Sequence, residues 1–306
     1  MFGPDQGVDP PIVYPYGIAK DGDLPFRVLG KISTDGATVT GYTENALFTA
    51  RNGADGAESG VESLYHIATG KGTSWLAGSY NGRILQSVDG TTVSYSEGTL
   101  SWSGGSIPDN VNANGTWGGV DFRAGSLPVV VHTTDIYSHD APNPYFSWSM
   151  TRFKYNELVR SVPAPHYTAD LIPVLRQKGI RIITLGVPSK LGDPVVADEL
   201  EQMTTWARES NAIVPVCAFE NACGPNLCCL GTTTKPGMTI NGRDNQCVLY
   251  YTSNQGDVSK YITKGVDALV KYGTYEVATR IEGEPIAGAK VDTSCFIKQV
   301  VATAYV

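Results

Sequence analysis

Val129-Val-Val-His-Thr-Thr-Asp135 and Ile180-Arg-Ile-Ile-Thr-Leu-Gly-Val187 are the two stretches that decide the fold of this chain. Each is a near-continuous apolar run, which is typical of a strand buried on both faces in a parallel sheet. Between them, Ala169–Lys178 is predicted as a helix that ends at Gly179, because glycine readily adopts the left-handed conformation of a helix C-cap. This order of strand, helix and strand predicts a βαβ unit.

Further helices are indicated by apolar residues spaced three and four positions apart. They are predicted over residues 58–68, from the Asp193-Pro194 pair onward, and over residues 258–271 after Asp257 as a candidate cap. Their apolar faces are, in chain order, Val61, Leu64, Tyr65 and Ala68; Val196, Leu200, Met203 and Ala207; and Ile262, Val266, Leu269 and Val270. Short strands are predicted at residues 213–216 and 274–281.

Residues 70–127 have a different character, because Gly, Ser, Thr, Asn and Trp dominate and short alternating runs predict hairpin strands. Residues 1–27 are rich in Pro and Gly and are predicted to be irregular. We therefore expect an α/β fold with a doubly wound, mostly parallel sheet and helices on both faces. It would form a single domain over residues 1–306, with a β-hairpin-rich insertion at 70–127 and a Cys-rich loop at 217–247.

Bulk composition narrows the classes of function. The chain has 306 residues, of which 42% are apolar, and its formal net charge is -7. No run of Lys and Arg could follow a phosphate backbone, which disfavours nucleic acid as a partner. No stretch of 18 apolar residues occurs, so no membrane span is expected. The first residues lack the basic and apolar regions of a signal peptide.

All six cysteines lie in the last third of the chain, most of them in a polar segment rich in Gly, Pro and Asn. An even count in such a segment favours disulfides and an oxidising compartment. The alternative is a zinc site, but zinc sites usually place paired ligands on two arms. Here the second arm offers only Cys247 and Cys295, without a nearby His. The candidate disulfide residues are Cys217, Cys223, Cys228, Cys229, Cys247 and Cys295.

Two loops carry carboxylates at positions where α/β proteins build sites. Asp55 and Glu58 precede the helix predicted at 58–68, and Asp135 follows the strand that begins at Val129. Loops at the carboxyl ends of parallel strands meet at one edge of the sheet. Oxygen ligands of this kind suit a hard divalent cation. The alternative is structural, because Asp55 and Glu58 could cap and stabilise the first turn of the helix.

The order of these features resembles the von Willebrand factor A (VWA) domain, in the version found in integrin β subunits. Asp55-Gly-Ala-Glu-Ser-Gly-Val-Glu-Ser-Leu64 is similar to the family's Asp-x-Pro-Glu-Gly loop and helix, with Ala57 in place of the proline. Val131-His-Thr-Thr-Asp135 is similar to its Val-Phe-Thr-Thr-Asp segment. The Cys-rich tail resembles that of large VWA proteins secreted by myxobacteria.

The resemblance implies a metal-ion-dependent adhesion site at the top of the sheet. Glu58 would be a direct metal ligand, Asp135 would hold the metal directly or through water, Thr134 would support the loop, and Asp55 would serve a neighbouring cation position. The cofactor would be Mg²⁺, or Ca²⁺ or Mn²⁺. The partner would be a protein or surface ligand that offers a carboxylate. A non-enzymatic adhesion domain at the cell surface or outside the cell is therefore expected.

One motif of the family is missing. Its first strand ends in Asp-x-Ser-x-Ser, which supplies three of the metal contacts, and nothing near the start of this sequence matches it. We therefore expect a chain truncated at its amino end, with the strand and a signal peptide lying upstream. The cation would then be bound weakly.

Two other functions fit parts of the sequence. Trp75, Tyr80, Trp102 and Trp117 in the insertion could stack on sugars, although aromatic residues there more often form a small core. His132, Asp135 and His139, with Asp140 nearby, could hold zinc in a metal hydrolase, which requires an open coordination position. Neither a Gly-x-Ser-x-Gly elbow nor a phosphate-binding Gly-x-x-x-x-Gly-Lys-[Ser/Thr] loop is present.

Overall fold

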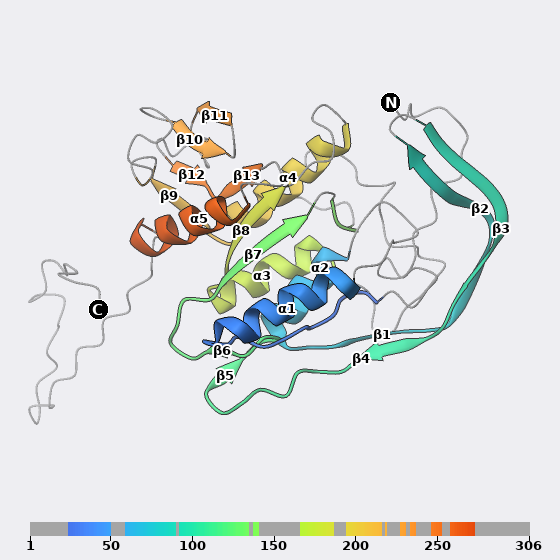
Figure 1. The fold of residues 1–306 in the computed structure, drawn as a ribbon, viewed down its shortest axis with the longest axis horizontal. Coiled ribbons are helices and arrows are strands. Elements are labelled where there is room, and N and C mark those ends of the chain that lie inside the picture. Colours follow the sequence, from blue (N-terminus) through green and yellow to red (C-terminus); the bar gives the residue numbers. More distant parts are fainter. Residues whose placement is uncertain are drawn as a thin grey trace, which may run out of the picture. The chain divides into compact units, whose positions relative to one another are not determined.

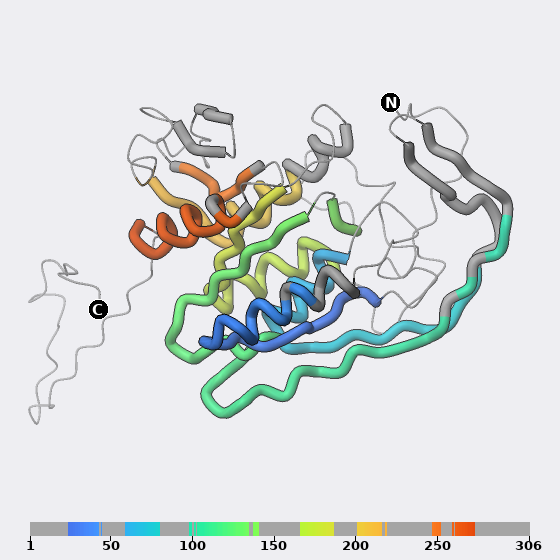
Figure 2. The backbone as a smooth tube through the Cα atoms, in the orientation of Figure 1, coloured from blue at the N-terminus to red at the C-terminus, as the bar shows by residue number. Residues whose placement is uncertain are grey.

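The computed structural model describes part of the chain, and Figure 2 follows the backbone through it. The described residues are 24–49, 59–89, 92–134, 137–140, 166–186, 194–215, 218, 227–230, 233–236, 246–252 and 258–272. The chain divides into two compact units, Met1–Thr274 and Tyr275–Val306, and every described residue belongs to the first.

The described structure contains a small parallel sheet (Figure 1). Strands β7 (Val129–Thr134), β8 (Arg181–Gly186) and β13 (Tyr250–Thr252) form it in the order β13-β8-β7, and both pairings are parallel. Helix α3 (Thr168–Lys178) lies between β7 and β8 in sequence and ends at Gly179, whose φ of 66° is left-handed. The predicted βαβ unit and its helix end are therefore confirmed.

Both faces of β8 are buried, as its near-continuous apolar sequence predicted. Consecutive strand residues point to opposite faces. Ile182 packs in a cluster with residues of α2 (Gly60–Thr69) and α3, whereas Ile183 packs in a second cluster with α5 (Val258–Tyr272). Helix α4 (Pro194–Glu209) contributes Trp206 to the first cluster and Met203 and Ala207 to the second. Helices thus bury both faces of this strand.

Among the described residues the parallel sheet has three strands and the other strands form separate antiparallel pairs, so the predicted doubly wound sheet is not confirmed. The strand expected at 213–216 forms as β9 (Ile213–Pro215), but it pairs antiparallel with β12 (Gln246–Val248) and is not part of the parallel sheet. Proline lacks an amide hydrogen to donate across a ladder and is confined to strand edges, which suits Pro215 to a short peripheral pair. The strand expected at 274–281 lies outside the described residues.

The helical stripes can be compared with burial where side chains are described, which excludes Val196 and Leu200. The stripe residues that are buried, as predicted, are Val61, Leu64, Ala68, Met203, Ala207 and Leu269, while Tyr65, Ile262 and Val266 are partly buried. The prediction for Val270 was wrong, because it is 58% exposed. Ala268 and Leu269 are both buried, so the core face of α5 lies on their side, and Val270 is about 100° further round the helix.

Helix α1 (Gly36–Thr49) was not predicted. Its first half contains two glycines and three β-branched residues, which are poor helix formers. The helix begins at a strong local signal instead. The Asp35 carboxylate accepts hydrogen bonds from the amides of Ala37 (3.3 Å) and Thr38 (3.0 Å), as an N-cap residue does.

Antiparallel pairs make up the stretch between α2 and β7, as its alternating pattern predicted. The pairs are β1 (Thr73–Trp75) with β4 (Gly105–Ile107), β2 (Gly78–Asp89) with β3 (Thr92–Trp102), and β5 (Thr116–Trp117) with β6 (Phe122–Arg123). A further pair, β10 (Leu227–Leu230) with β11 (Thr233–Pro236), lies in the Cys-rich loop. Among the described helices, none has the length and apolar character that crossing a membrane requires.

The core cluster that contains Ile182 and residues of α2 and α3 should contribute most to the free energy of unfolding. Leu171→Ala removes a side chain with no exposed surface, and we expect it to lower the free energy of unfolding by about 2–5 kcal/mol through lost burial and the cavity left behind. The matched control is Leu76→Ala, at a position 59% exposed, which should change it by less than about 0.5 kcal/mol. Urea unfolding of both variants measures the difference, and equal effects would contradict this assignment of the core.

Candidate functional site

The residues predicted to hold a cation lie at the border of the described structure. Asp55, Glu58 and Asp135 fall outside the described residues, whereas Thr134 ends β7 opposite Gly186 of β8. Ser59 follows Glu58 and Thr134 precedes Asp135, and these two described residues show where the loops of Glu58 and Asp135 join the fold. Helix α2 begins at Gly60, two residues after Glu58, and β7 ends immediately before Asp135.

The start of α2 and the carboxyl end of β7 touch each other. A Cβ atom added to Gly60 would collide with Ser138 Oγ and would come within 3.2 Å of His132 Nε2. Only glycine therefore fits at the first position of the helix without displacing its neighbours. His132 belongs to β7 and Ser138 follows that strand, so the anchor points of the two carboxylate loops are adjacent.

Two buried polar atoms at these anchor points have no hydrogen-bond partner: Ser59 Oγ and His132 Nδ1. Ser59 is 8% exposed and precedes α2, yet its hydroxyl does not cap the helix. Burial lowers the pKa of His132 to about 4, because the charged imidazolium loses its hydration there. This ring is therefore neutral at neutral pH, and it lies edge-on to Trp206 with the ring centroids 5.2 Å apart.

A buried polar network fastens the segment that follows β7. Gln202 of α4 accepts a hydrogen bond from the Ser138 amide (2.7 Å) and donates one to the Ser138 carbonyl (3.2 Å). The Asp140 carboxylate accepts bonds from the Thr168 amide (2.9 Å) and hydroxyl at the start of α3. Trp206 Nε1 in turn donates to Thr168 Oγ1 (2.9 Å). Segment 137–140 is thereby tied to two helices.

This network already engages Asp140, which lies near the residues predicted to hold zinc in a hydrolase. Asp140 has no exposed surface and serves as a structural acceptor at the start of a helix, where a carboxylate is also favoured by the helix dipole. His139 is 1% exposed. Within the described part of the chain, no group of three His, Cys, Asp or Glu side chains could hold a metal ion.

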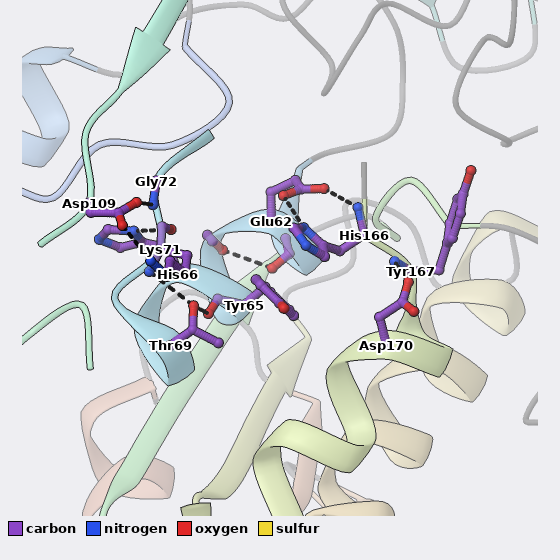
Figure 3. Close-up of polar contacts among 12 residues, drawn as sticks. Glu62, Tyr65, His66, Thr69, Lys71, Gly72, Asp109, His166, Tyr167 and Asp170 are labelled. Atoms are coloured by element: carbon purple, nitrogen blue, oxygen red, sulfur yellow. Dashed lines mark hydrogen bonds and ion pairs between the residues drawn. The ribbon is translucent and has the colours of Figure 1, made fainter. Parts of the chain in front are cut away.

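A second polar cluster joins α2 to the start of α3 (Figure 3). Glu62 is 2% exposed, and its carboxylate accepts hydrogen bonds from the backbone amide of His166 and, at 3.0 Å, from the ring Nδ1 of the same residue. The Tyr65 ring stacks on His166, with centroids 3.5 Å apart and planes 15° apart. The imidazole is thus held by a buried charge at its edge and by an aromatic ring on its face.

An open pocket of about 420 Å³ adjoins His166 and Tyr65. Its opposite wall contains Lys71 and Asp109, whose charged groups are 2.7 Å apart, and Asp109 also accepts a bond from the Gly72 amide (2.8 Å). The hydrogen bond from Lys71 lowers the pKa of Asp109, and the same bond raises the pKa of Lys71. Both groups are therefore charged at neutral pH.

The sequence did not reveal this second cluster. Glu62 and His166 are 104 residues apart, and neither belongs to a motif with a characteristic spacing. Glu62 lies about 100° from Val61 on the predicted helix, at the edge of its apolar face, so the pattern did not show that it is buried. Its partner has no local signal either.

The described aromatic residues of the insertion serve its packing. Trp75 is 6% exposed, and its Nε1 donates to the Ser103 carbonyl (3.0 Å). Trp117 packs on Phe122 with ring centroids 4.9 Å apart, and Lys178 Nζ lies 5.5 Å from the Trp117 ring. Tyr80 and Trp102 lie in β2 and β3, respectively. The described part favours the small-core interpretation over a sugar-stacking surface.

One cysteine is assigned by the structure. Cys247 lies in β12, has no exposed surface and is disulfide-bonded. Cys228 and Cys229 lie in β10, while Cys217, Cys223 and Cys295 fall outside the described residues. The disulfide interpretation therefore holds for Cys247, and this residue is not available as a zinc ligand.

Comparison with protein-family models, with curated proteins and with solved structures found no match to this chain.

The network behind β7 can be tested through its central amide. Gln202→Ala leaves the Ser138 amide and carbonyl without partners in a buried position, and we expect the free energy of unfolding to fall by about 1–3 kcal/mol. Gln177→Ala, at an exposed position of α3, is the matched control and should change it by less than about 0.5 kcal/mol. Thermal and urea unfolding measure both, and a neutral Gln202→Ala would show that segment 137–140 is held by other contacts.

Proposed function

We propose that this chain is a non-enzymatic adhesion or protein-binding domain that works outside the cell or at its surface. It recognises its partner through a divalent cation at the carboxyl ends of the parallel strands. Glu58 and Asp135 hold the cation, Asp55 serves a neighbouring position, and Thr134 supports the loop.

The main observation behind this proposal is the close approach of Gly60 to His132 and Ser138. Glu58 is two residues from Gly60, and Asp135 lies between His132 and Ser138 in the sequence. Two loops with adjacent anchor points can supply oxygen ligands to a single ion. A site built this way at a strand edge also agrees with where α/β proteins bind their ligands.

The buried Ser59 hydroxyl supports the fit of a cation. It adjoins Glu58 in the chain and has no protein partner. A buried hydroxyl without a hydrogen bond costs free energy, and its oxygen is a suitable donor to a hard cation or to water bound by one. Mg²⁺, Ca²⁺ and Mn²⁺ all accept ligand sets of carboxylate, hydroxyl and water oxygens.

The partner is a protein or surface ligand that offers a carboxylate. A cation held by few protein oxygens keeps positions for water, which an incoming carboxylate can replace. The VWA-like order of the acidic loop, the helix and the Thr-Thr-Asp strand end supports the same mode of recognition. Because no Asp-x-Ser-x-Ser motif adds its three contacts, the affinity of this chain for the ion is expected to be low.

Two variants test the proposed cation site with the metal alone. Mn²⁺ should bind to the wild-type protein in isothermal titration calorimetry, and Glu58→Gln and Asp135→Asn should each weaken binding by at least about tenfold, since each removes a charged ligand. Asp267→Asn, on the exposed face of α5, is the matched control and should bind Mn²⁺ like the wild type.

Adhesion itself has a separate readout. A glutamate-containing peptide added to the Mn²⁺-loaded protein should displace bound water and lower the Mn²⁺-induced relaxation of water protons. EDTA should abolish peptide binding. Peptide binding that persists in EDTA, or Mn²⁺ affinity that is unchanged in both carboxylate variants, would remove the cation from the account.

A further inference from the structure

The pocket beside α2 has the size and construction of a small-molecule site. Its volume of about 420 Å³ lies within the range of about 300–1,000 Å³ that is typical of ligand pockets. Residues from distant parts of the chain meet there: the end of α2, β1, the segment after β4, and His166 before α3. It lies apart in sequence from the loops of the proposed cation site and does not depend on that proposal.

Glu62 determines which nitrogen of His166 is available to a ligand. An ionised carboxylate only accepts hydrogen bonds, so the bond of 3.0 Å to Glu62 places the proton on Nδ1. Nε2 takes no part in that bond and is left for a ligand. His166 lines the pocket and its side chain is 22% exposed, so this part of the ring can be reached from solvent.

Two features fix the orientation of that ring. The Glu62 carboxylate receives both the ring N–H and the backbone amide of His166, which prevents the ring from turning freely. Tyr65 covers one face of the ring, and Figure 3 shows the imidazole between Glu62 and Tyr65. A ring nitrogen whose side chain is already immobilised loses little conformational entropy when a ligand binds.

The opposite wall supplies both donors and acceptors without net charge. Lys71 and Asp109 neutralise each other at 2.7 Å, so the pair does not select for an anion or a cation. Ser106 contributes a hydroxyl. A ligand that satisfies these groups must itself both donate and accept.

We propose that this pocket binds a neutral polyhydroxylated ligand of the size of one sugar residue, with a ligand hydroxyl hydrogen-bonded to His166 Nε2. Hydroxyl groups both donate and accept, so they match the His166 ring nitrogen, the Lys71 donor and the Asp109 acceptor at the same time. Trp75 and Trp117, which pack within the protein, are not needed for this binding.

Four monosaccharides serve as probes: glucose, galactose, mannose and N-acetylglucosamine. Isothermal titration of the wild-type chain should detect at least one of them with a dissociation constant in the millimolar range. His166→Asn keeps a donor toward Glu62 but removes Nε2, and it should weaken binding at least about tenfold. Glu62→Gln, which removes the carboxylate that holds the ring in place, should have the same effect. Glu44→Gln, at an exposed position of α1, should bind like the wild type.

A second measurement uses the wild-type protein alone and does not depend on the variants folding. Long-range ¹H–¹⁵N spectra observe the His166 ring nitrogens, and the Nε2 resonance should shift as the sugar is added. Absence of binding by all four sugars would overturn the proposal, and so would equal affinity in the His166→Asn variant. Binding of Zn²⁺ or inorganic phosphate in place of the sugars would assign the pocket to an ion instead.

Discussion

The parallel pairing of β7 with β8 is the interaction on which the rest of the described structure depends. It places Val130 beside Ile182 and Val131 beside Ile183. Because successive residues face opposite sides of the sheet, this register directs Ile182 into one core and Ile183 into the other. The same pairing brings the carboxyl ends of both strands to one edge, next to the start of α2.

Polar contacts then fix the connections that the apolar cores leave undetermined. Gln202 and Asp140 connect segment 137–140 to α4 and α3. Glu62 of α2 accepts hydrogen bonds from His166, which lies just before α3. Buried polar groups are costly unless their partners are in place, so each of these contacts favours one arrangement of the helices over others. The pocket beside α2 adjoins the contact between Glu62 and His166. The start of α2, next to Glu58 in sequence, lies close to Ser138, which is bound by Gln202.

The sequence predicted what is determined by local pattern. The apolar runs at 129–131 and 180–187 became adjacent parallel strands, and Gly179 ended α3 as its position indicated. Pattern failed where the outcome depends on distant partners. Nothing local shows that β9 pairs with β12 rather than with the sheet, or that Glu62 meets His166 across 104 residues. Helix α1 was missed for another reason, because its first half has weak helix propensity and its cap, Asp35, is a single residue.

The central claim is that the loops bearing Glu58 and Asp135 share one divalent cation. Crystals grown with Mn²⁺ and measured at its absorption edge test this claim most directly, because the anomalous difference density locates the ion independently of any assumed ligand. The account predicts a peak between the two carboxylates, with oxygen atoms at roughly 2.0–2.6 Å as hard-cation ligands require. A peak elsewhere, or two carboxylates that each bind only protein groups while Mn²⁺ is present in excess, would contradict it.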